Sequence, residues 1–554
     1  MFERFRQRLE QMQRWESAMV YALAAGEDAS IFAWPLPLLL PLGLFQTLCF
    51  RSRRMMPPSL GILFIAETWL VGFLVLSVPF WLYGFSPVDA LFESVSGFTT
   101  TGASIVADIE ALPNSLLLWR GLVQWAGGIT VVLIFTFLLP MLGVGSSSFV
   151  SNEFVGSDSE TYTARVTNRA FRFIETYFLL TVVEIVILCL LDTGVLNAFC
   201  IAFSNIPTGG QLPQNDSMAG YGIEVQAVTL VFMFLGATNY YLLFRTIFRR
   251  DAKSLFRNEE LQNMFLWFLL CIAVITAVLL FQNDFQLDRL FTPEARSDLW
   301  EAAYCVVSAG TSTGFAIVDY KGWPILALMV LVMAEFVGGM SGSTSGGVKI
   351  HRLIVLRSYI NTGLKRMIHP NAIANVRVNN QNMSSSMINS AISTIILFMV
   401  TTAVAMAVLM VLEPELDLES YLGITVAFIS NTGISIGYFG PMDSYAPLAD
   451  STKLFLCFLM WMGRMELVMA LMLFTKNFWT DVRLNLGTRG RSVNLHNLVP
   501  RRPQGAPAAC AIVKMTAPAF RRAAEKLSAL KRFIRPYGTW PGSGTRPDCP
   551  VPAR

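Results

Sequence analysis

The sequence predicts an all-α polytopic membrane protein. Of its 554 residues, 54% are hydrophobic and only 14% are charged, and the mean hydropathy is +0.51. A soluble chain of this length cannot bury that much apolar surface, and several apolar runs approach the roughly 20 residues that span a bilayer. The sequence does not show the alternating segments of about ten residues that a membrane β-barrel requires.

Long apolar runs predict the membrane helices. They lie at 31–50, 60–83, 116–141, 171–191, 222–244, 263–281, 322–340, 387–412 and 453–475. A weaker run at 17–26 precedes them, so the region 1–54 is expected to hold extra membrane helices. Basic residues gather in alternate loops, for example Arg51, Arg165, Arg249 and Lys365. The positive-inside rule therefore places these loops, and the basic tail after 481, in the cytoplasm.

Cysteine, histidine and motif content exclude several classes of function. The eight cysteines are scattered, most of them inside apolar runs, and there is no CxxC pair. This pattern argues against a disulfide scaffold and a zinc site. Neither a phosphate-binding GxxxxGK[ST] motif nor a Rossmann fingerprint occurs. No nucleophile–base set or catalytic carboxylate pair is evident, so we expect neither an enzyme nor a cofactor in this chain.

A Thr-Gly dipeptide recurs four times, each time after a short apolar stretch and between two longer ones. The pairs are Thr101-Gly102, Thr208-Gly209, Thr313-Gly314 and Thr432-Gly433. They are spaced 105 to 119 residues apart and all fall in the loops poor in Lys and Arg. Recurrence at the same place in a helix, short helix, loop and helix unit predicts four pseudo-symmetric repeats.

The physical chemistry of this unit favours an ion pathway. Irregular backbone at membrane depth is tolerated where it lines a water-filled or ion-filled cavity. A short helix would direct its partly negative C-terminal end toward the membrane centre, and the following glycine can turn carbonyls inward. Four such loops around one axis form a ring of oxygens able to replace the hydration shell of a monovalent cation.

Five motifs carry a resemblance to a known family. They are "FESVSGFTTTGAS", "QWAGGITVVLIFTFLLPMLGVG", "EFVGGMSGSTSGGVKIHRLIVL", "HPNAI" and "GRMELVMALMLFT". The chain from about 55 to 480 resembles the Trk/Ktr/HKT superfamily of potassium transporters, and within it the Trk-type membrane subunits (TrkH/TrkG-like). The resemblance implies an N-terminal helix pair in 1–54, repeats at 55–145, 146–250, 251–365 and 366–480, and a partly disordered cytoplasmic tail at 481–554.

The resemblance also implies a selectivity filter with one glycine per repeat, at Gly102, Gly209, Gly314 and Gly433. It implies that potassium, the substrate, binds to carbonyl oxygens of Thr100, Thr101, Pro207, Thr208, Ser312, Thr313, Asn431 and Thr432. The second loop departs from the family pattern at Pro207 and Gln211. Cation binding is expected to persist there, whereas discrimination between potassium and sodium is left open.

Two constellations suggest a gate. The segment 338–347, "GGMSGSTSGG", interrupts an apolar run with residues that do not hold a stable helix. It is interpreted either as a cytoplasmic turn or as an intramembrane gate, and the family resemblance favours the gate. The gate residues are Gly338, Gly339, Gly342, Ser343, Gly346, Gly347 and Arg464. Arg464, inside an apolar run, faces the pore or pairs with Glu466 or with carbonyls of the Gly-rich segment.

The resemblance further implies a homodimer in the bacterial inner membrane. It implies a cytoplasmic ring of RCK/KTN-type regulatory subunits, which would carry the nucleotide. No nucleic-acid partner is expected. Conduction is either passive or coupled to sodium or protons by symport. The alternatives are a sodium-coupled Ktr-like cation transporter and a secondary transporter of a small organic solute, and fourfold repetition counts against the latter.

Overall fold

A computed structural model describes residues 58–134, 159–282, 293–369, 375–379 and 381–492. The expected helices at 17–26 and 31–50, and most of the basic tail, lie outside the described residues. The described residues from Pro58 to Leu486 belong to one compact unit. A second unit begins at Gly487, and only the end of one helix is described there.

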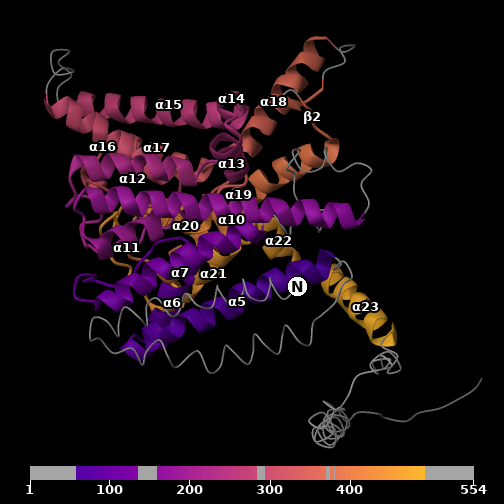
Figure 1. Cartoon of the computed structure of the whole chain (residues 1–554), viewed down its shortest axis with the longest axis horizontal. Coiled ribbons are helices and arrows are strands. Elements are labelled where there is room, and N and C mark those ends of the chain that lie inside the picture. Colours follow the sequence, from indigo (N-terminus) through magenta and orange to yellow (C-terminus); the bar gives the residue numbers. More distant parts are fainter. Residues whose placement is uncertain (1–57, 135–158, 283–292, 370–374, 380, 493–554) are drawn as a thin grey trace, which may run out of the picture. The chain divides into compact units, whose positions relative to one another are not determined.

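The described residues are predominantly helical, as the composition predicts (Figure 1). In chain order the helices are α5 (Pro58–Tyr83), α6 (Pro87–Phe98), α7 (Asn114–Leu133), α10 (Ser159–Leu190), α11 (Val195–Asn205), α12 (Ile223–Gly236), α13 (Tyr240–Arg249), α14 (Ala252–Phe256), α15 (Glu259–Gln282), α16 (Pro293–Gly310), α17 (Ile325–Val337), α18 (Ile350–Ile368), α19 (Ser385–Leu412), α20 (Leu418–Ser430), α21 (Asp450–Arg464), α22 (Leu467–Met472) and α23 (Lys476–Ser492). A 3-10 turn (Tyr320–Gly322) precedes α17, and a two-stranded antiparallel hairpin, β1 (Arg377–Val378) and β2 (Gln381–Asn382), follows α18.

Among the residues that the structure describes, four helices are each long and apolar enough to cross a membrane. The spans are Ser59–Tyr83 in α5, Arg172–Leu190 in α10, Glu259–Phe281 in α15 and Ser385–Leu412 in α19. Only 22–39% of their most apolar windows is buried, so apolar side chains cover much of their exposed surface. Such surface is stable in contact with lipid and costly in contact with water. The chain is therefore a multi-pass membrane protein.

A shorter helix follows each span and lies deeper in the fold. These helices are α6, α11, α16 and α20. In α20, every residue from Ser420 to Ser430 is buried except Leu422. A helix of 11 to 13 residues, such as α6, α11 or α20, does not cross a bilayer at 1.5 Å per residue. Each short helix therefore ends inside the protein, at a Thr-Gly loop.

Three helices that follow the loops are broken, and the sequence does not predict two of these breaks. The apolar run at 222–244 forms α12 and α13, which meet at 108°. The run at 453–475 forms α21 and α22, separated at Glu466 by a backbone φ of 66°. The third break, residues 338–349 between α17 and α18, is the Gly-rich loop, and it is non-helical as expected.

Candidate ion-conduction site

The four Thr-Gly sequences lie in loops that share one backbone conformation. Loop 1 (99–106) follows α6, loop 2 (206–212) follows α11, loop 3 (311–317) follows α16 and loop 4 (431–437) follows α20. Each loop has one residue in the left-handed region and, two positions later, a glycine with positive φ. The left-handed residues are Thr100, Thr208, Ser312 and Asn431, and the glycines are Gly102, Gly210, Gly314 and Gly433.

The residue between these two positions is held identically in every loop. Its amide donates a hydrogen bond of 2.8–2.9 Å to the carbonyl five residues earlier, inside the short helix. These bonds run from Thr101 to Ser96, from Gly209 to Ser204, from Thr313 to Ser308 and from Thr432 to Ala427. Shared dihedral angles and a shared hydrogen bond define the structural equivalence of the four loops.

The glycines bring the loops together in a closed ring. A Cβ atom placed on each glycine would lie within 2.5 Å of a backbone carbonyl oxygen of the next loop. The pairs are Gly102 with Gly209, Gly210 with Thr313, Gly314 with Thr432, and Gly433 with Thr101. The contacts follow chain order and return from loop 4 to loop 1. Backbone oxygens from all four loops therefore lie around one ring, and only glycine permits this approach.

The sequence-based assignment of loop 2 is shifted by one residue. Gly210, not Gly209, has the conformation of Gly102, and Thr208 corresponds to Thr100. The candidate oxygen donors of this loop are accordingly Thr208 and Gly209 instead of Pro207 and Thr208. The cause is the sequence PTGG, in which the first of two glycines takes the position that threonine has in the other loops.

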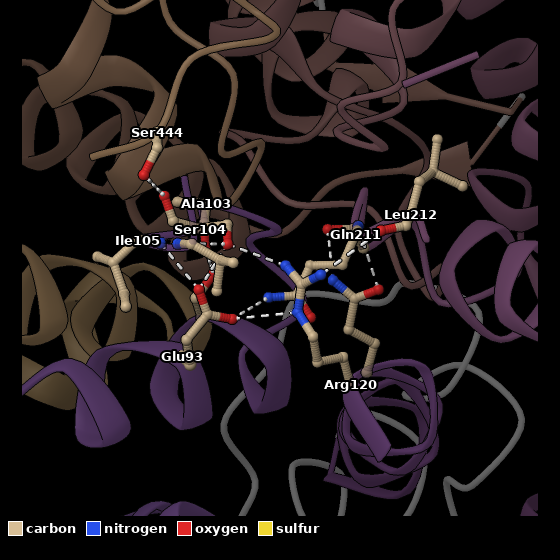
Figure 2. A network of polar contacts seen from close by, with 12 residues as sticks. Glu93, Ala103, Ser104, Ile105, Arg120, Gln211, Leu212 and Ser444 are labelled. Carbon is tan, nitrogen blue, oxygen red and sulfur yellow. Dashed lines mark hydrogen bonds and ion pairs between the residues drawn. The ribbon is translucent and has the colours of Figure 1, made fainter. Parts of the chain in front are cut away.

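A buried network of charged and polar side chains connects loops 1 and 2 (Figure 2). The carboxylate of Glu93, midway along α6, accepts hydrogen bonds from the Ser104 hydroxyl (2.6 Å) and the Ile105 amide (2.8 Å). Its second oxygen meets Arg120 Nε of α7 at 3.3 Å and Gln211 Nε2 of loop 2 at 3.1 Å. Glu93 therefore ties the end of loop 1 to loop 2.

This network predicts a large loss of stability when Glu93 is replaced by alanine. The side chains of Glu93 and Arg120 are 0% and 2% exposed, so the variant leaves a buried guanidinium without its carboxylate. Breaking such a pair costs about 3–5 kcal/mol. We expect a clearly lower melting temperature of the purified protein in detergent. The control is Glu175→Ala, which removes a half-exposed ion pair with Arg172 worth about 0–1 kcal/mol; equal shifts in both variants would contradict the prediction.

The Gly-rich loop divides into two parts with different neighbours. Its first part packs on the break between α12 and α13: the Met340 amide donates to Ala237 O (3.0 Å), and Gly342 O accepts from the Tyr240 amide (3.3 Å). Gly338, Gly339, Gly342 and Ser343 belong to this part, where Ser343 Oγ donates to Met340 O (2.6 Å). These four predicted gate residues make no recorded hydrogen bond to the Thr-Gly loops within the described residues.

The second part of the Gly-rich loop lies directly against the ring. Thr344 Oγ1 donates to Ile206 O of loop 2 at 3.1 Å. The Gly346 amide donates to Ser312 Oγ of loop 3 at 2.6 Å. The Gly347 amide donates to the carbonyl of Ser430, the last residue of α20 before loop 4, at 3.1 Å. Gly346 and Gly347 are thus in contact with the ring, as is Thr344, which sequence reasoning did not single out.

Arg464 supplies the remaining contact, to loop 1. Its guanidinium donates from Nη1 to Thr344 O (2.9 Å) and from Nη2 to the Thr100 hydroxyl. Of the partners expected from sequence, the Gly-rich loop carbonyl is correct, whereas Glu466 pairs with Arg352 at 2.7 Å. Arg464 is 5% exposed and lines a cavity of about 30 Å³ together with Lys349 and Gly346. A fixed positive charge therefore lies between the ring and the Gly-rich loop.

Comparisons with known proteins identify the family. A family model for TrkH, described as "Cation transport protein", matches residues 73–481. The chain belongs to the TrkH family. It is 33% identical over 398 residues to the Trk system potassium uptake protein TrkI of Halomonas elongata, covering 71% of this chain and 78% of that protein. It is 30% identical over 439 residues to TrkH of Salmonella typhimurium, covering 78% and 88%.

A solved structure agrees with this assignment. The crystal structure of the potassium transporter TrkH from Vibrio parahaemolyticus matches with a TM-score of 0.74 and 25% identity. The match covers 84% of this chain and 96% of that one. The helical architecture of this TrkH-family chain is therefore that of a solved relative.

Two further acids of this TrkH-family chain, Glu184 and Glu335, are buried within apolar runs. Glu184 of α10 accepts a 2.6 Å hydrogen bond from Asn205 Nδ2, at the end of α11. Glu335 of α17 is 1% exposed and lies three residues before the Gly-rich loop. Glu184 thus supports the end of the short helix α11.

Three residues that sequence reasoning missed are Arg120, Gln124 and Thr344. Arg120 and Gln124 lie four residues apart on α7, and both are buried. Polar side chains one helical turn apart inside an apolar run were a signal for them, because such residues rarely face lipid. Thr344 had no comparable signal, since the composition of the Gly-rich segment does not distinguish it from its neighbours.

Proposed function

We propose that this chain is the membrane subunit of a potassium uptake system of a bacterial inner membrane. The main observation behind the proposal is the closed ring, in which a glycine of each loop lies against a backbone carbonyl oxygen of the next loop. The printed names of the relatives in Halomonas elongata and Salmonella typhimurium, both potassium uptake proteins, support the choice of ion. The apolar spans support a multi-pass location in the membrane.

In this proposal the ring is the selectivity filter of four pseudo-symmetric repeats around one pore. Carbonyl oxygens take the place of water around a dehydrated potassium ion. The donors are those of Thr100, Thr101, Thr208, Gly209, Ser312, Thr313, Asn431 and Thr432. Each loop begins at the C-terminal end of a short helix, where the partial negative charge of the helix dipole favours a cation.

The Gly-rich loop and Arg464 form the gate of the proposed pathway. Together they reach loops 1, 2 and 3, through Thr100, Ile206 and Ser312, and the end of α20 directly before loop 4, through Ser430. A positive charge and closely packed backbone at this point oppose the passage of a cation. Opening then requires the loop to leave the ring, which is an order–disorder or hinge movement of one segment.

In this proposal, separate protein chains regulate the opening of the gate. We propose a homodimer whose cytoplasmic face, including the tail, rests on a ring of nucleotide-binding regulatory subunits. Nucleotide binding there would favour one state of the gate, as a ligand does when its affinity differs between two conformations. The helix α18 follows the Gly-rich loop in the chain, and its basic residues, among them Arg352, Lys365 and Arg366, suit this coupling.

Potassium-limited growth and rubidium uptake in an uptake-deficient bacterium test the proposed function. Cells that produce this chain are expected to grow at low potassium and to accumulate radioactive rubidium. Excess potassium should inhibit that uptake, whereas equal sodium should not. Membrane insertion of the chain is checked by immunoblot of the membrane fraction, and inserted protein without any rubidium uptake would contradict the proposal.

A further inference from the structure

Loop 2 lacks the threonine side chain that the other three loops have. In the equivalent position, loops 1, 3 and 4 carry Thr101, Thr313 and Thr432, and loop 2 carries Gly209. The hydroxyls of Thr101 and Thr313 are each 2.8 Å from the hydroxyl of the threonine two residues earlier. Loop 2 has Pro207 at that earlier position and therefore has neither member of the hydroxyl pair.

The side chain of Gln124 fills the space that this threonine would occupy. Gly209 is not among the residues with positive φ, so its backbone conformation does not demand glycine. A Cβ atom on Gly209 would instead lie 2.7 Å from Gln124 Cδ and 2.8 Å from its Oε1. Real Cβ atoms essentially never come this close to another heavy atom. A side chain at position 209 is thus excluded unless the Gln124 side chain moves from its hydrogen bonds with loop 2.

The Gln124 amide also holds loop 2 on both sides of Gly210. Its Nε2 donates to Gly209 O at 2.8 Å, and its Oε1 accepts from the Gln211 amide at 3.4 Å. Gly209 O is the oxygen that lies against Gly102 in the ring. Gln124 is completely buried, so no water competes for these bonds. The position of one ring oxygen therefore depends on a side chain from outside the loop.

One face of α7 supports the seam between loops 1 and 2. Arg120 reaches Glu93 and Ser104, and Gln124 one turn later reaches loop 2. Two turns after Arg120, a Cβ atom on Gly127 would clash with Phe98 O, at the end of α6. Residues at i, i+4 and i+7 share a helix face. This face positions the two loops relative to each other.

We propose that Gln124 is a positioning residue for cation selection. Its side chain, which comes from α7, occupies the space of the threonine side chain that loop 2 lacks, and it fixes the position of Gly209 O. The inference rests on the proposed function, because it assumes that the ring selects potassium. It predicts that Gln124 and Gly209 act as one pair. A threonine at 209 is expected to leave the ring undisturbed only when the glutamine side chain is removed, because otherwise Gln124 must leave its hydrogen bonds with loop 2.

A double-mutant cycle in proteoliposomes tests this, with separate uptake of radioactive rubidium and sodium as readouts. Gln124→Ala is expected to lower the rubidium-to-sodium ratio about tenfold, the effect of one lost buried hydrogen bond. Gly209→Thr alone should lower the rubidium-to-sodium ratio at least as far, because the threonine side chain clashes with Gln124. The double variant Gln124→Ala/Gly209→Thr should recover to within about threefold of wild type. Gln124→Asn, shorter by one methylene, should give an intermediate ratio and serves if the alanine variant does not fold.

The control is Thr130→Val on the same helix, whose hydroxyl donates only to Ala126 O one turn earlier; its ratio should equal that of wild type. Unchanged ratios in Gln124→Ala and Gln124→Asn, or a double variant as poor as the product of the single effects, would overturn the inference. Wild-type protein that transports neither cation would instead refute the proposed function. The two failures are therefore distinguishable.

Discussion

Replacement of Gly433 by alanine is expected to abolish potassium-selective uptake. A Cβ atom there meets the Thr101 carbonyl oxygen and lies 2.6 Å from the Ala103 amide nitrogen, both backbone atoms of loop 1. Backbone cannot rotate away as a flexible side chain can. The φ of 78° adds a cost for any residue with a Cβ. Loop 4 must therefore move away from loop 1, which opens the ring where it closes.

Rubidium uptake in the uptake-deficient bacterium measures this effect, with sodium as competitor. We expect at least about a hundredfold loss of selective uptake, since carbonyl positions determine which dehydrated ion is accepted. The matched control is Gly363→Ala on α18, where a Cβ atom meets nothing within 4 Å. Selective uptake by Gly433→Ala at the wild-type level would rule out the ring as the filter.

Replacement of Arg464 by alanine is expected to raise cation flux. The guanidinium bonds to Thr344 of the Gly-rich loop and to Thr100 of loop 1, so its loss removes both a positive charge and the link between gate and ring. An increase of about tenfold corresponds to about 1.4 kcal/mol, a modest part of the interaction of a buried charge with a passing cation. Initial rubidium uptake into proteoliposomes gives the flux directly.

Arg172→Ala is the matched control for this experiment. Its side chain is 54% exposed and pairs with Glu175 on the outside of α10, so flux should stay at the wild-type level. A shortened Gly-rich loop, lacking part of residues 338–347, should raise flux as Arg464→Ala does. Wild-type flux in both the Arg464 variant and the shortened loop would exclude the gate.

The helical architecture was predictable because apolar length is a strong signal. The runs at 60–83, 171–191, 263–281 and 387–412 are confirmed as spans, and the shorter stretches before the loops form the short helices. The breaks at Ala237 and Glu466 were not predictable. Apolar residues continue on both sides of each break, and the backbone groups at the first break are paired by Met340 and Gly342, about 100 residues away. The sequence around a break does not reveal such distant hydrogen-bond partners.

In the candidate site, too, the recurring loops were predictable from the sequence, whereas contacts with distant residues were not. Four equivalent loops were located because Thr-Gly recurs at similar spacing. In loop 2 the Thr-Gly dipeptide of PTGG lies one residue earlier, relative to the backbone conformation, than in the other three loops. The assignment by dipeptide was therefore shifted by one residue. Gln124 lies about 85 residues before the glycine whose place it determines. The reason for Gly209 is therefore found only when α7 and loop 2 are seen together.

The order of the ring contacts has a consequence for biosynthesis. Each glycine faces a carbonyl of the loop that follows it in the chain, except Gly433, which faces Thr101. Loop 1 is thus synthesised more than 300 residues before its last neighbour exists. During that interval the loop 1 carbonyls on this side have no neighbouring loop, so the ring is still open. Completion of the fourth unit is the step that turns an inserted bundle of helices into a closed ring.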